Sequence, residues 1–276
     1  MIPADILVTD QVAIVTGGAN GLGEGIAMAL AHYGAHIVIA DVDVENGERV
    51  AGAIRALGRK ALLVQTDCTD TDAIRAMVAR AAEHFGAIDI LVNNVGGSRQ
   101  IGFMEQSERS WRRHIDLNLV SMLAATHAVV PTMAAGKRGG TIINISSSEG
   151  LRAAPGYAVY AACKAGMVSF TRSMSLELSQ HSIRVFALAP DMLDTPGLKP
   201  FYDAATPAEV EARNRYIPLG RLGTMKEIGD VAVFLCSKMS SYLTGITISV
   251  DAGTIASSGW SRTDDNGWTL FPLQPK

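Results

Sequence analysis

Short, almost continuously apolar segments alternate along the chain with longer stretches in which apolar residues recur every three or four positions. The segments predict strands buried on both faces of a parallel sheet: Val12–Thr16, His36–Ala40, Ala61–Gln65, Ile88–Val92, Thr141–Ile145, Arg184–Leu188 and Ile246–Val250. In the stretch 71–85, Ile74, Met77, Val78 and Ala81 lie on one side of a helix. The alternation predicts an α/β fold with a doubly wound seven-stranded parallel sheet and helices on both faces.

No internal repeat or linker divides the chain, so residues 1–276 are predicted to form a single domain. Two segments break the alternation. The segment 191–221 carries four prolines and is expected to be an insertion that acts as a substrate lid. The C-terminal tail, 254–276, contains Trp260 and Trp268 and would fold over a substrate pocket or a neighbouring subunit, or be disordered.

Composition excludes several classes of function. The chain is 48% hydrophobic and 18% charged, with a net charge of −3, as in ordinary globular proteins. No basic field is available to bind nucleic acid or anionic lipid, so neither partner is expected. No apolar run approaches the roughly 18 residues of a membrane span, and the acidic start of the chain does not resemble a secretory signal, so we expect a cytoplasmic protein. The spacing of Cys and His residues predicts no metal site.

The first predicted strand runs into the turn Thr16-Gly17-Gly18-Ala19-Asn20-Gly21-Leu22-Gly23, before a helix that begins near Glu24. Glycines here allow a tight turn and a close approach of the backbone to a pyrophosphate, whose charge the helix N-terminus favours. Asp41 ends the second strand 18 residues after Gly23, where a carboxylate accepts hydrogen bonds from an adenosine ribose. The spacing predicts a Rossmann-type dinucleotide site.

Asp41 also predicts which dinucleotide is bound. A 2′-phosphate about 4 Å from its carboxylate would be repelled by about 4 kcal/mol per unit charge at an effective dielectric near 20. That energy corresponds to roughly a thousandfold in affinity. Neither Val42 nor Asp43 supplies a positive charge, so NAD is predicted as the cofactor.

Candidate acid–base chemistry lies further along the chain. Tyr160 and Lys164 are four residues apart and share a helix face, which is usually a solvated face. Ser147 ends the fifth strand 13 residues before Tyr160, so all three side chains can reach the sheet edge where the dinucleotide would lie. Lowering a tyrosine pKa from about 10 to near neutrality takes roughly 4 kcal/mol, which one adjacent ammonium supplies. We therefore expect Lys164 to lower the pKa of Tyr160.

Several motifs occur in order: TGGANGLG, NNVG, Asn118 after Trp111, ISS and YxxxK. From about Gln11 to Gly253 they resemble the classical short-chain dehydrogenase/reductase family. The resemblance implies four catalytic residues, Asn118, Ser147, Tyr160 and Lys164. Tyr160 would exchange a proton with the substrate oxygen, Ser147 would hydrogen-bond that oxygen, Lys164 would hold the ribose, and Asn118 would hold a proton-relaying water.

The implied site extends along the sheet edge. The cofactor-binding candidates are Gly17, Asn20, Gly21, Leu22, Gly23, Asp41, Val42, Asp67, Cys68, Asn94, Val95, Gly96, Tyr160, Lys164, Pro190, Leu193 and Thr195. The substrate candidates are Gly97, Ser98, Ser147, Ser148, Tyr157, Asp191 and Met192, with the segment around Phe201 and Tyr202. The chain departs from the family pattern at Val95, usually Ala, and at Asp191, usually Gly. An inward Asp191 side chain would disfavour anionic substrates or support NAD⁺, and an outward one would be solvated.

The sequence thus predicts an NAD-dependent oxidoreductase that transfers a hydride between a secondary alcohol or ketone and nicotinamide. An NADPH-dependent carbonyl or 3-oxoacyl thioester reductase is an alternative that conflicts with Asp41. A catalytically silent dinucleotide-binding sensor is an alternative of another class. A serine hydrolase is disfavoured because Ser147 lacks the GxSxG context. The resemblance also implies a homo-oligomer, a tetramer or dimer.

Overall fold

The computed structural model describes residues 4–270 and contains the predicted seven-stranded sheet, with the order β3-β2-β1-β4-β5-β6-β9 and every neighbouring pair parallel. Its strands are β1 (Val12–Thr16), β2 (His36–Asp41), β3 (Ala61–Gln65), β4 (Ile90–Asn93), β5 (Gly140–Ile145), β6 (Ile183–Pro190) and β9 (Thr247–Val250). The strand order reverses between β1 and β4, and ligands bind parallel sheets at this kind of crossover. The fold prediction is confirmed.

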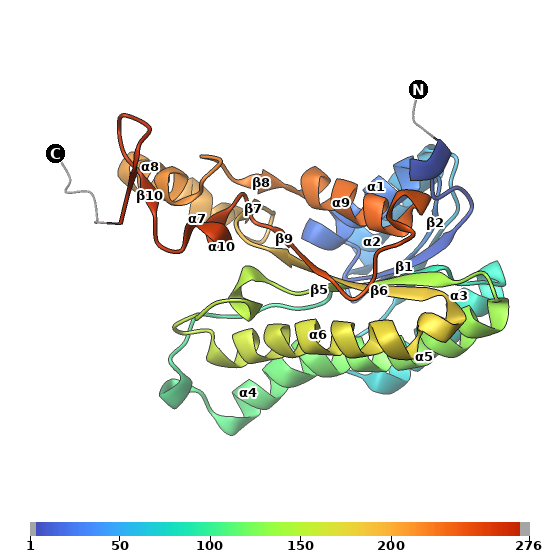
Figure 1. Cartoon of the computed structure of the whole chain (residues 1–276). Helices are drawn as coiled ribbons and strands as arrows, with labels where there is room; N and C mark the ends of the chain where they lie inside the picture. The colour runs from blue at the N-terminus through green and yellow to red at the C-terminus, as the bar shows by residue number, and fades with distance from the viewer. Residues whose placement is uncertain (1–3, 271–276) are drawn as a thin grey trace.

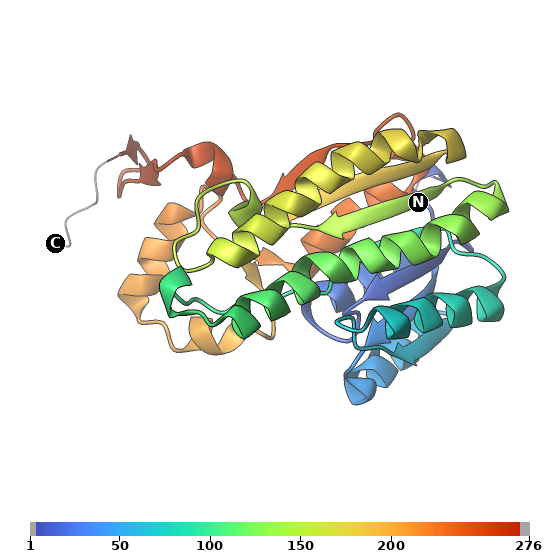
Figure 2. The same ribbon diagram turned by 90° about the horizontal axis from the view of Figure 1, so that it is seen from below.

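Helices cover both faces of the sheet (Figure 1). One layer holds α1 (Gly21–His32), α2 (Val44–Ala56) and α9 (Met225–Cys236), and the other holds α3 (Thr71–Phe85), α4 (Glu108–Ile115), α5 (Ser121–Gly136) and α6 (Ala158–Glu177). Figure 2 shows α5 and α6 running side by side beneath the sheet. Short 3₁₀ turns occupy Ala4–Ile6, Phe103–Glu105, Ser148–Gly150, Ser179–His181 and Lys238–Ser240, and a π turn, Asp116–Val120, joins α4 to α5.

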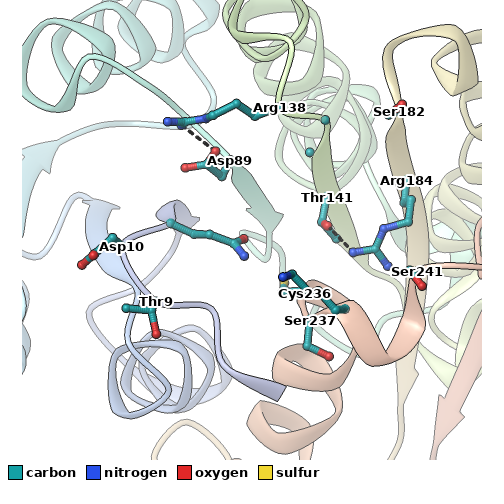
Figure 3. Close-up of a pocket in the computed structure, with 14 residues that line it drawn as sticks. Thr9, Asp10, Asp89, Arg138, Thr141, Ser182, Arg184, Cys236, Ser237 and Ser241 are labelled. Atoms are coloured by element: carbon teal, nitrogen blue, oxygen red, sulfur yellow. Dashed lines mark hydrogen bonds and ion pairs between the residues drawn. The ribbon is translucent and has the colours of Figure 1, made fainter. Parts of the chain in front are cut away.

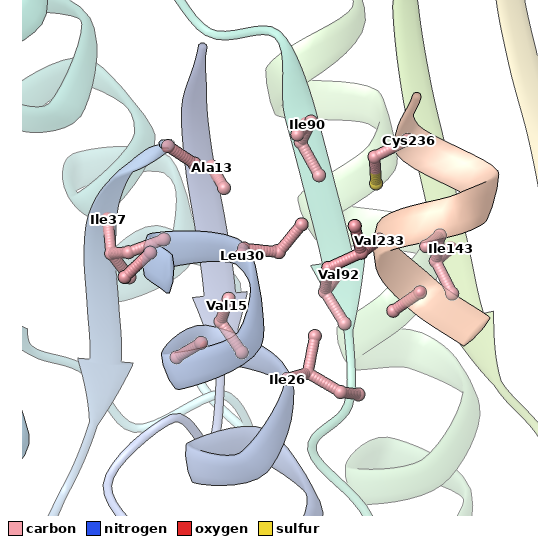
Figure 4. Packing of buried hydrophobic residues seen from close by; sticks show 14 of the residues in the cluster. Ala13, Val15, Ile26, Leu30, Ile37, Ile90, Val92, Ile143, Val233 and Cys236 are labelled. Atoms are coloured by element: carbon pink, nitrogen blue, oxygen red, sulfur yellow. The ribbon is translucent and has the colours of Figure 1, made fainter. Parts of the chain in front are cut away.

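Apolar packing fixes each layer on the sheet. Ile26 and Leu30 of α1 and Val233 of α9 are almost fully buried against β1 and β4, where they meet Val15 and Val92 (Figure 4). The strands are therefore apolar on both sides, because each faces a helical layer. This packing holds the carboxyl ends of β1, β4, β5 and β6 in fixed register, and the loops that follow them form the site.

Helices α4 and α5 with the π turn between them form one helical stretch, Glu108–Gly136, that is long and apolar enough to cross a membrane by length and composition. The expectation that no stretch reaches this length is therefore wrong. However, α5 packs against α3 and β4, and Ala125, Val129 and Met133 are buried there. This is the placement of a core helix, whose apolar side faces the sheet.

The segment 191–221 and the tail lie together at one end of the molecule (Figure 1). They contain β7 (Leu193–Asp194), α7 (Lys199–Asp203), α8 (Pro207–Tyr216), α10 (Thr254–Ser257), β10 (Ser261–Arg262) and β11 (Trp268–Thr269), and β7 pairs with β8 (Gly223–Thr224), which follows the segment. The antiparallel pair β10–β11 contacts α8, where Arg215 is ion-paired with Asp264 and Arg262 Nε donates to Pro218 O at 3.0 Å. The part of the tail up to residue 270 is thus folded against α8, and 271–276 lie outside the described residues.

Candidate active site

A cleft of about 530 Å³ opens at the carboxyl edge of the sheet, between the loops that follow β1, β4, β5 and β6. This volume is typical of small-molecule sites. The lining residues are Gly17, Asn20, Gly21, Leu22, Asp41, Val42, Asn94, Val95, Gly96, Gly97, Ile145, Ser146, Ser147, Tyr160, Lys164, Pro190, Asp191, Leu193, Thr195, Gly197 and Leu198. Most of the predicted site residues are therefore brought together in one cleft.

The glycine-rich turn suits a dinucleotide phosphate. Helix α1 begins at Gly21, which has φ +56° and open space where a side chain would be, and Asn20 makes no side-chain capping hydrogen bond. A Cβ at Gly23 would lie 2.0 Å from Gly17 O, so only glycine fits there. Gly23 thus supports the turn from within and does not line the cleft, whereas the helix N-terminus beside Gly21 is accessible to an anion.

The turn is joined to the loop after β4 by hydrogen bonds that the sequence did not reveal. Asn94 Nδ2 donates to Thr16 O at 2.9 Å and to Gly17 O at 3.1 Å, and Asn94 N donates to Thr16 Oγ1 at 3.0 Å. Asn94 therefore holds the two walls of the cleft together, and Thr16 is a positioning residue. The only signal for Thr16 was its place at the start of the glycine run.

The Asp41 carboxylate is fixed at the other end of the cleft. Its Oδ2 accepts from Ala19 N and its Oδ1 accepts from Asp43 N, both at 3.0 Å. The Asp43 side chain in turn accepts from Asn46 N and caps the N-terminus of α2. These bonds orient the Asp41 carboxylate at the mouth of the glycine turn, and its contact with an adenosine ribose stays a prediction.

Two of the predicted cofactor-binding residues, Asp67 and Cys68, do not line the cleft. Asp67 accepts from the backbone N and the hydroxyl of Thr69, which lowers the pKa of its carboxyl and caps its own turn. Cys68 is buried, and burial raises the pKa of its thiol to about 12. In this structure both residues shape the turn after β3, because local backbone bonds satisfy Asp67.

Ser147, Tyr160 and Lys164 meet in the cleft. The side chains of Ser147 and Tyr160 are hydrogen-bonded to each other, and Ser147 Oγ also accepts from Glu149 N at 3.1 Å. Lys164 is buried and its Nζ donates to Ile145 O at 2.7 Å, which ties α6 to the end of β5. Burial lowers the pKa of Lys164 to about 8. The neutral and charged forms of this lysine are therefore close in energy.

The expected effect of Lys164 on Tyr160 is not what the structure shows. Burial raises the pKa of Tyr160 above its ordinary value, and the hydrogen bond from Ser147 opposes this only in part. Lys164 Nζ lies 5.5 Å from the centre of the Tyr160 ring and is bonded to Ile145 O. Helix spacing places Tyr160 and Lys164 on one face, but the Lys164 ammonium is hydrogen-bonded to the carbonyl of Ile145 and not to the Tyr160 hydroxyl.

Asn118 is fully buried in the π turn. Its Oδ1 accepts from Gly97 N, and its Nδ2 donates to Gly97 O and His114 O, at 2.9 to 3.0 Å. The side chain thus fixes the loop after β4 against the α4–α5 helix. The proton-relaying water that the family resemblance implies stays a prediction.

The substrate end of the cleft differs from the prediction. Gly97, Ser147 and Asp191 line it, but Ser98, Ser148, Tyr157 and Met192 are not among the lining residues. Ser148 is fully buried and its hydroxyl has no hydrogen-bond partner among residues 4–270. Of the predicted segment around Phe201 and Tyr202, neither residue lines the cleft. The lining residues that the sequence missed are Ile145, Ser146, Gly197 and Leu198.

Asp191 points inward. Its side chain is 9% exposed and pairs with Arg152 Nη2 at 3.1 Å, and Thr254 Oγ1 donates to its Oδ2. Burial raises the pKa of this carboxyl, while the Thr254 bond and the Arg152 charge oppose the rise. Asp191 therefore does not act on a substrate as a lone charge, because Arg152 neutralises much of it.

A second cavity, of about 480 Å³, lies at the opposite edge of the sheet, where the strands begin (Figure 3). Both arginines in its lining already have partners: Arg138 is ion-paired with Asp89 at 2.6 Å, and Arg184 donates to Thr141 Oγ1 and Ser240 O. It contains none of the predicted catalytic residues, so the cleft at the carboxyl edge is the candidate active site.

Comparison with known proteins agrees with this geometry. A family model described as Enoyl-(Acyl carrier protein) reductase matches residues 17–254. A 3-oxoacyl-acyl-carrier-protein reductase FabG from Chlamydia muridarum is 39% identical, over 90% of this chain and 98% of the relative. The chain belongs to the classical short-chain dehydrogenase/reductase family. It is thus an oxidoreductase of a family that binds a nicotinamide dinucleotide.

Other members of this short-chain dehydrogenase/reductase family differ in their substrates. A cis-4-hydroxycyclohexanecarboxylate dehydrogenase from Sinomonas cyclohexanicum is 38% identical, over 90% of this chain and 97% of the relative. The solved structure of a 7α-hydroxysteroid dehydrogenase, in complex with NADH and 7-oxo glycochenodeoxycholic acid, is 31% identical with a TM-score of 0.85. That match covers 92% of this chain and 98% of the other.

Proposed function

We propose that this protein is an NAD-dependent dehydrogenase that interconverts a secondary alcohol and its ketone. The observation that carries the proposal is the cleft itself, which runs from the fixed carboxylate of Asp41 to the hydrogen-bonded pair of Ser147 and Tyr160. A carboxylate at the ribose position favours NAD over NADP because it repels a 2′-phosphate. The names of both dehydrogenase relatives given above contain a secondary alcohol or the matching ketone, which supports this substrate class.

The residues of the cleft fit a dinucleotide. The N-terminus of α1 near Gly21 would hold the pyrophosphate and Asp41 the adenosine ribose. Lys164 would hold the other ribose, because Ile145 O and the weak acceptor Met167 Sδ leave one of the three ammonium donors free. Bound nicotinamide supplies or accepts the hydride. Tyr160 Oη exchanges a proton with the substrate oxygen, and Ser147 Oγ hydrogen-bonds that oxygen as charge develops.

The test is a panel of cyclic, aromatic, steroid and hydroxyacyl secondary alcohols assayed in parallel with NAD⁺ and NADP⁺. We expect turnover with NAD⁺, and a loss of about 10²–10⁴-fold in kcat for Tyr160→Phe, the usual contribution of a general acid–base group. Tyr242→Phe is the matched control, because Tyr242 is fully exposed outside the cleft and should keep full activity. Turnover by Tyr160→Phe at the wild-type rate would refute this role for Tyr160.

A second candidate is an NADPH-dependent reductase of 3-oxoacyl thioesters, which the name of the Chlamydia muridarum relative favours. Cofactor preference separates the two, since Asp41 opposes NADPH. A third candidate is a dinucleotide-binding sensor without turnover. Tight NAD binding with no reaction on any member of the panel would favour that sensor.

We also propose a cytoplasmic homo-oligomer. A groove of about 660 Å³ lies on the outer side of α5 and α6 and is largely apolar, with Leu123, Val130, Phe170 and Met174 among its lining. The two long helices can bury this surface against the same helices of a second copy. A symmetric interface of this kind gives a dimer, and a second symmetric interface would join two dimers into a tetramer. Sedimentation velocity that finds only monomers at micromolar concentration would refute it.

A further inference from the structure

Three parts of the chain meet at the Arg152 guanidinium beside the cleft. Arg152 Nη2 lies 2.7 Å from Glu149 Oε1 and 3.1 Å from Asp191 Oδ2, and Nη1 donates to Tyr216 Oη at 2.6 Å. Glu149 belongs to the turn that carries Ser147, Asp191 follows β6 and lines the cleft, and Tyr216 ends α8. We propose that Arg152 is a positioning residue that holds the catalytic turn, the end of β6 and helix α8 together.

The contacts are of a kind that resists movement. The side chains of Arg152 and Glu149 are each 25% exposed and that of Asp191 is 9% exposed, so water screens these charges less than it screens a surface pair. A guanidinium has five donors in a fixed planar fork and can therefore satisfy three partners in one geometry. Although burial opposes it, the hydrogen bond to Glu149 and the charge of Asp191 raise the pKa of Arg152, which keeps it charged.

This arrangement also bears on Tyr160. The groups that act on the Tyr160 hydroxyl are Ser147 through its hydrogen bond, and Glu149 and Tyr157, whose charged forms raise the pKa of Tyr160. On the same helix, the Lys164 ammonium lies over the ring. Arg152 supplies the positive charge opposite Glu149 and so reduces the effect of that carboxylate. Positioning by Arg152 and proton transfer by Tyr160 are coupled through Glu149.

Only the expected effect of Arg152 on the pH profile rests on the proposed function. The first test therefore measures structure and does not need turnover. Hydrogen exchange of the α8 amides is measured in wild type, Arg152→Gln and Tyr216→Phe. We expect faster exchange in α8 for both variants, because each loses the bond that ties Tyr216 to the catalytic turn. Arg55→Gln is the control: it removes an arginine from an exposed pair with Glu48 on α2 and should change nothing in α8.

The second test is the pH dependence of kcat/KM for alcohol oxidation. In Arg152→Gln the charge of Glu149 is no longer neutralised, so the acidic limb should move to higher pH by about half a unit to one unit. Adding Glu149→Gln to that variant should return the limb towards wild type while α8 exchange stays fast. Tyr216→Phe and Arg152→Lys should leave the limb in place, because both keep the positive charge.

Unchanged α8 exchange in Tyr216→Phe and Arg152→Gln overturns the proposal, and so does an acidic limb that does not move in an active Arg152→Gln enzyme. If Arg152→Gln does not fold, Tyr216→Phe decides the question by exchange. If the wild type oxidises no alcohol, the proposed function fails, and hydrogen exchange still tests the bridge on its own.

Discussion

Removing the charge of Asp41 is expected to relax the choice of cofactor. Asp41 Oδ2 and Oδ1 are held by Ala19 N and Asp43 N, so the carboxylate cannot turn away from an incoming 2′-phosphate. At about 4 Å and an effective dielectric near 20 the repulsion is about 4 kcal/mol per unit charge, a ratio of roughly a thousandfold. Because the site is open to solvent and salt, we expect Asp41→Asn to change the ratio by about ten- to a thousandfold.

The assay is kcat/KM for NAD⁺ and NADP⁺ with one alcohol at fixed ionic strength, in wild type and Asp41→Asn. The asparagine side chain has the size of the aspartate and keeps one oxygen for Ala19 N, but its NH2 group cannot accept from Asp43 N, so urea unfolding of both proteins checks that the turn stays folded. Asp67→Asn is the matched control, because Asp67 caps its own turn outside the cleft and should leave the ratio unchanged. A wild type that prefers NADP⁺, or a ratio that Asp41→Asn moves by less than about threefold, would refute the electrostatic argument.

Three further outcomes follow from the structure. Gly23→Ala should cost about 1–3 kcal/mol of stability and weaken NAD binding, because its Cβ would meet Gly17 O. Gly52→Ala is the control and should not destabilise the protein, because a Cβ there meets open space. Urea unfolding measures the stability and calorimetry measures NAD binding. In the cofactor-free protein Lys164 has a pKa of about 8 in the folded state against 10.5 in the unfolded chain. The unfolded chain therefore binds more protons between these two values, and the free energy of unfolding of the wild type rises with pH over that range. In urea titrations, the stability of Lys164→Met relative to the wild type should fall from pH 8 to pH 10.5. Truncation after Gly253 removes the hairpin that packs on α8. It should speed the proteolysis of α8 and raise the KM for alcohol. Unaltered values of both would show that the tail does not support α8.

The fold could be predicted because its information is local. Each strand is a continuous apolar run, and α3 was predicted with the bounds Thr71–Phe85 that the structure has. The errors lie at strand ends. The predicted strand that begins at Ile88 begins at Ile90, and just before it the Asp89 carboxylate accepts from Val12 N. β6 extends to Pro190 because it pairs with β9 as far as Val250, a non-local partner.

The site could be predicted only as far as spacing along the chain reaches. Tyr160 and Lys164 share a helix face, but the atom that the ammonium contacts, Ile145 O, belongs to a strand 19 residues away in sequence. Asp191 was recognised as unusual, but its partner Arg152 lies 39 residues earlier and carries no motif. Such pairs form when separate elements pack, and no periodicity in the sequence records them.

The two ends of the cleft use negative charge in different ways. At the ribose end Asp41 is held by backbone donors, so its charge remains available to select a cofactor. At the substrate end the carboxylates of Asp191 and Glu149 share the Arg152 guanidinium, so one of their two negative charges is neutralised. The remaining negative charge is shared within a hydrogen-bonded network that includes Tyr216. A substitution at Asp41 should therefore change selectivity with little effect on structure. A substitution at Arg152 should change structure and acid–base chemistry together, because the same guanidinium serves both.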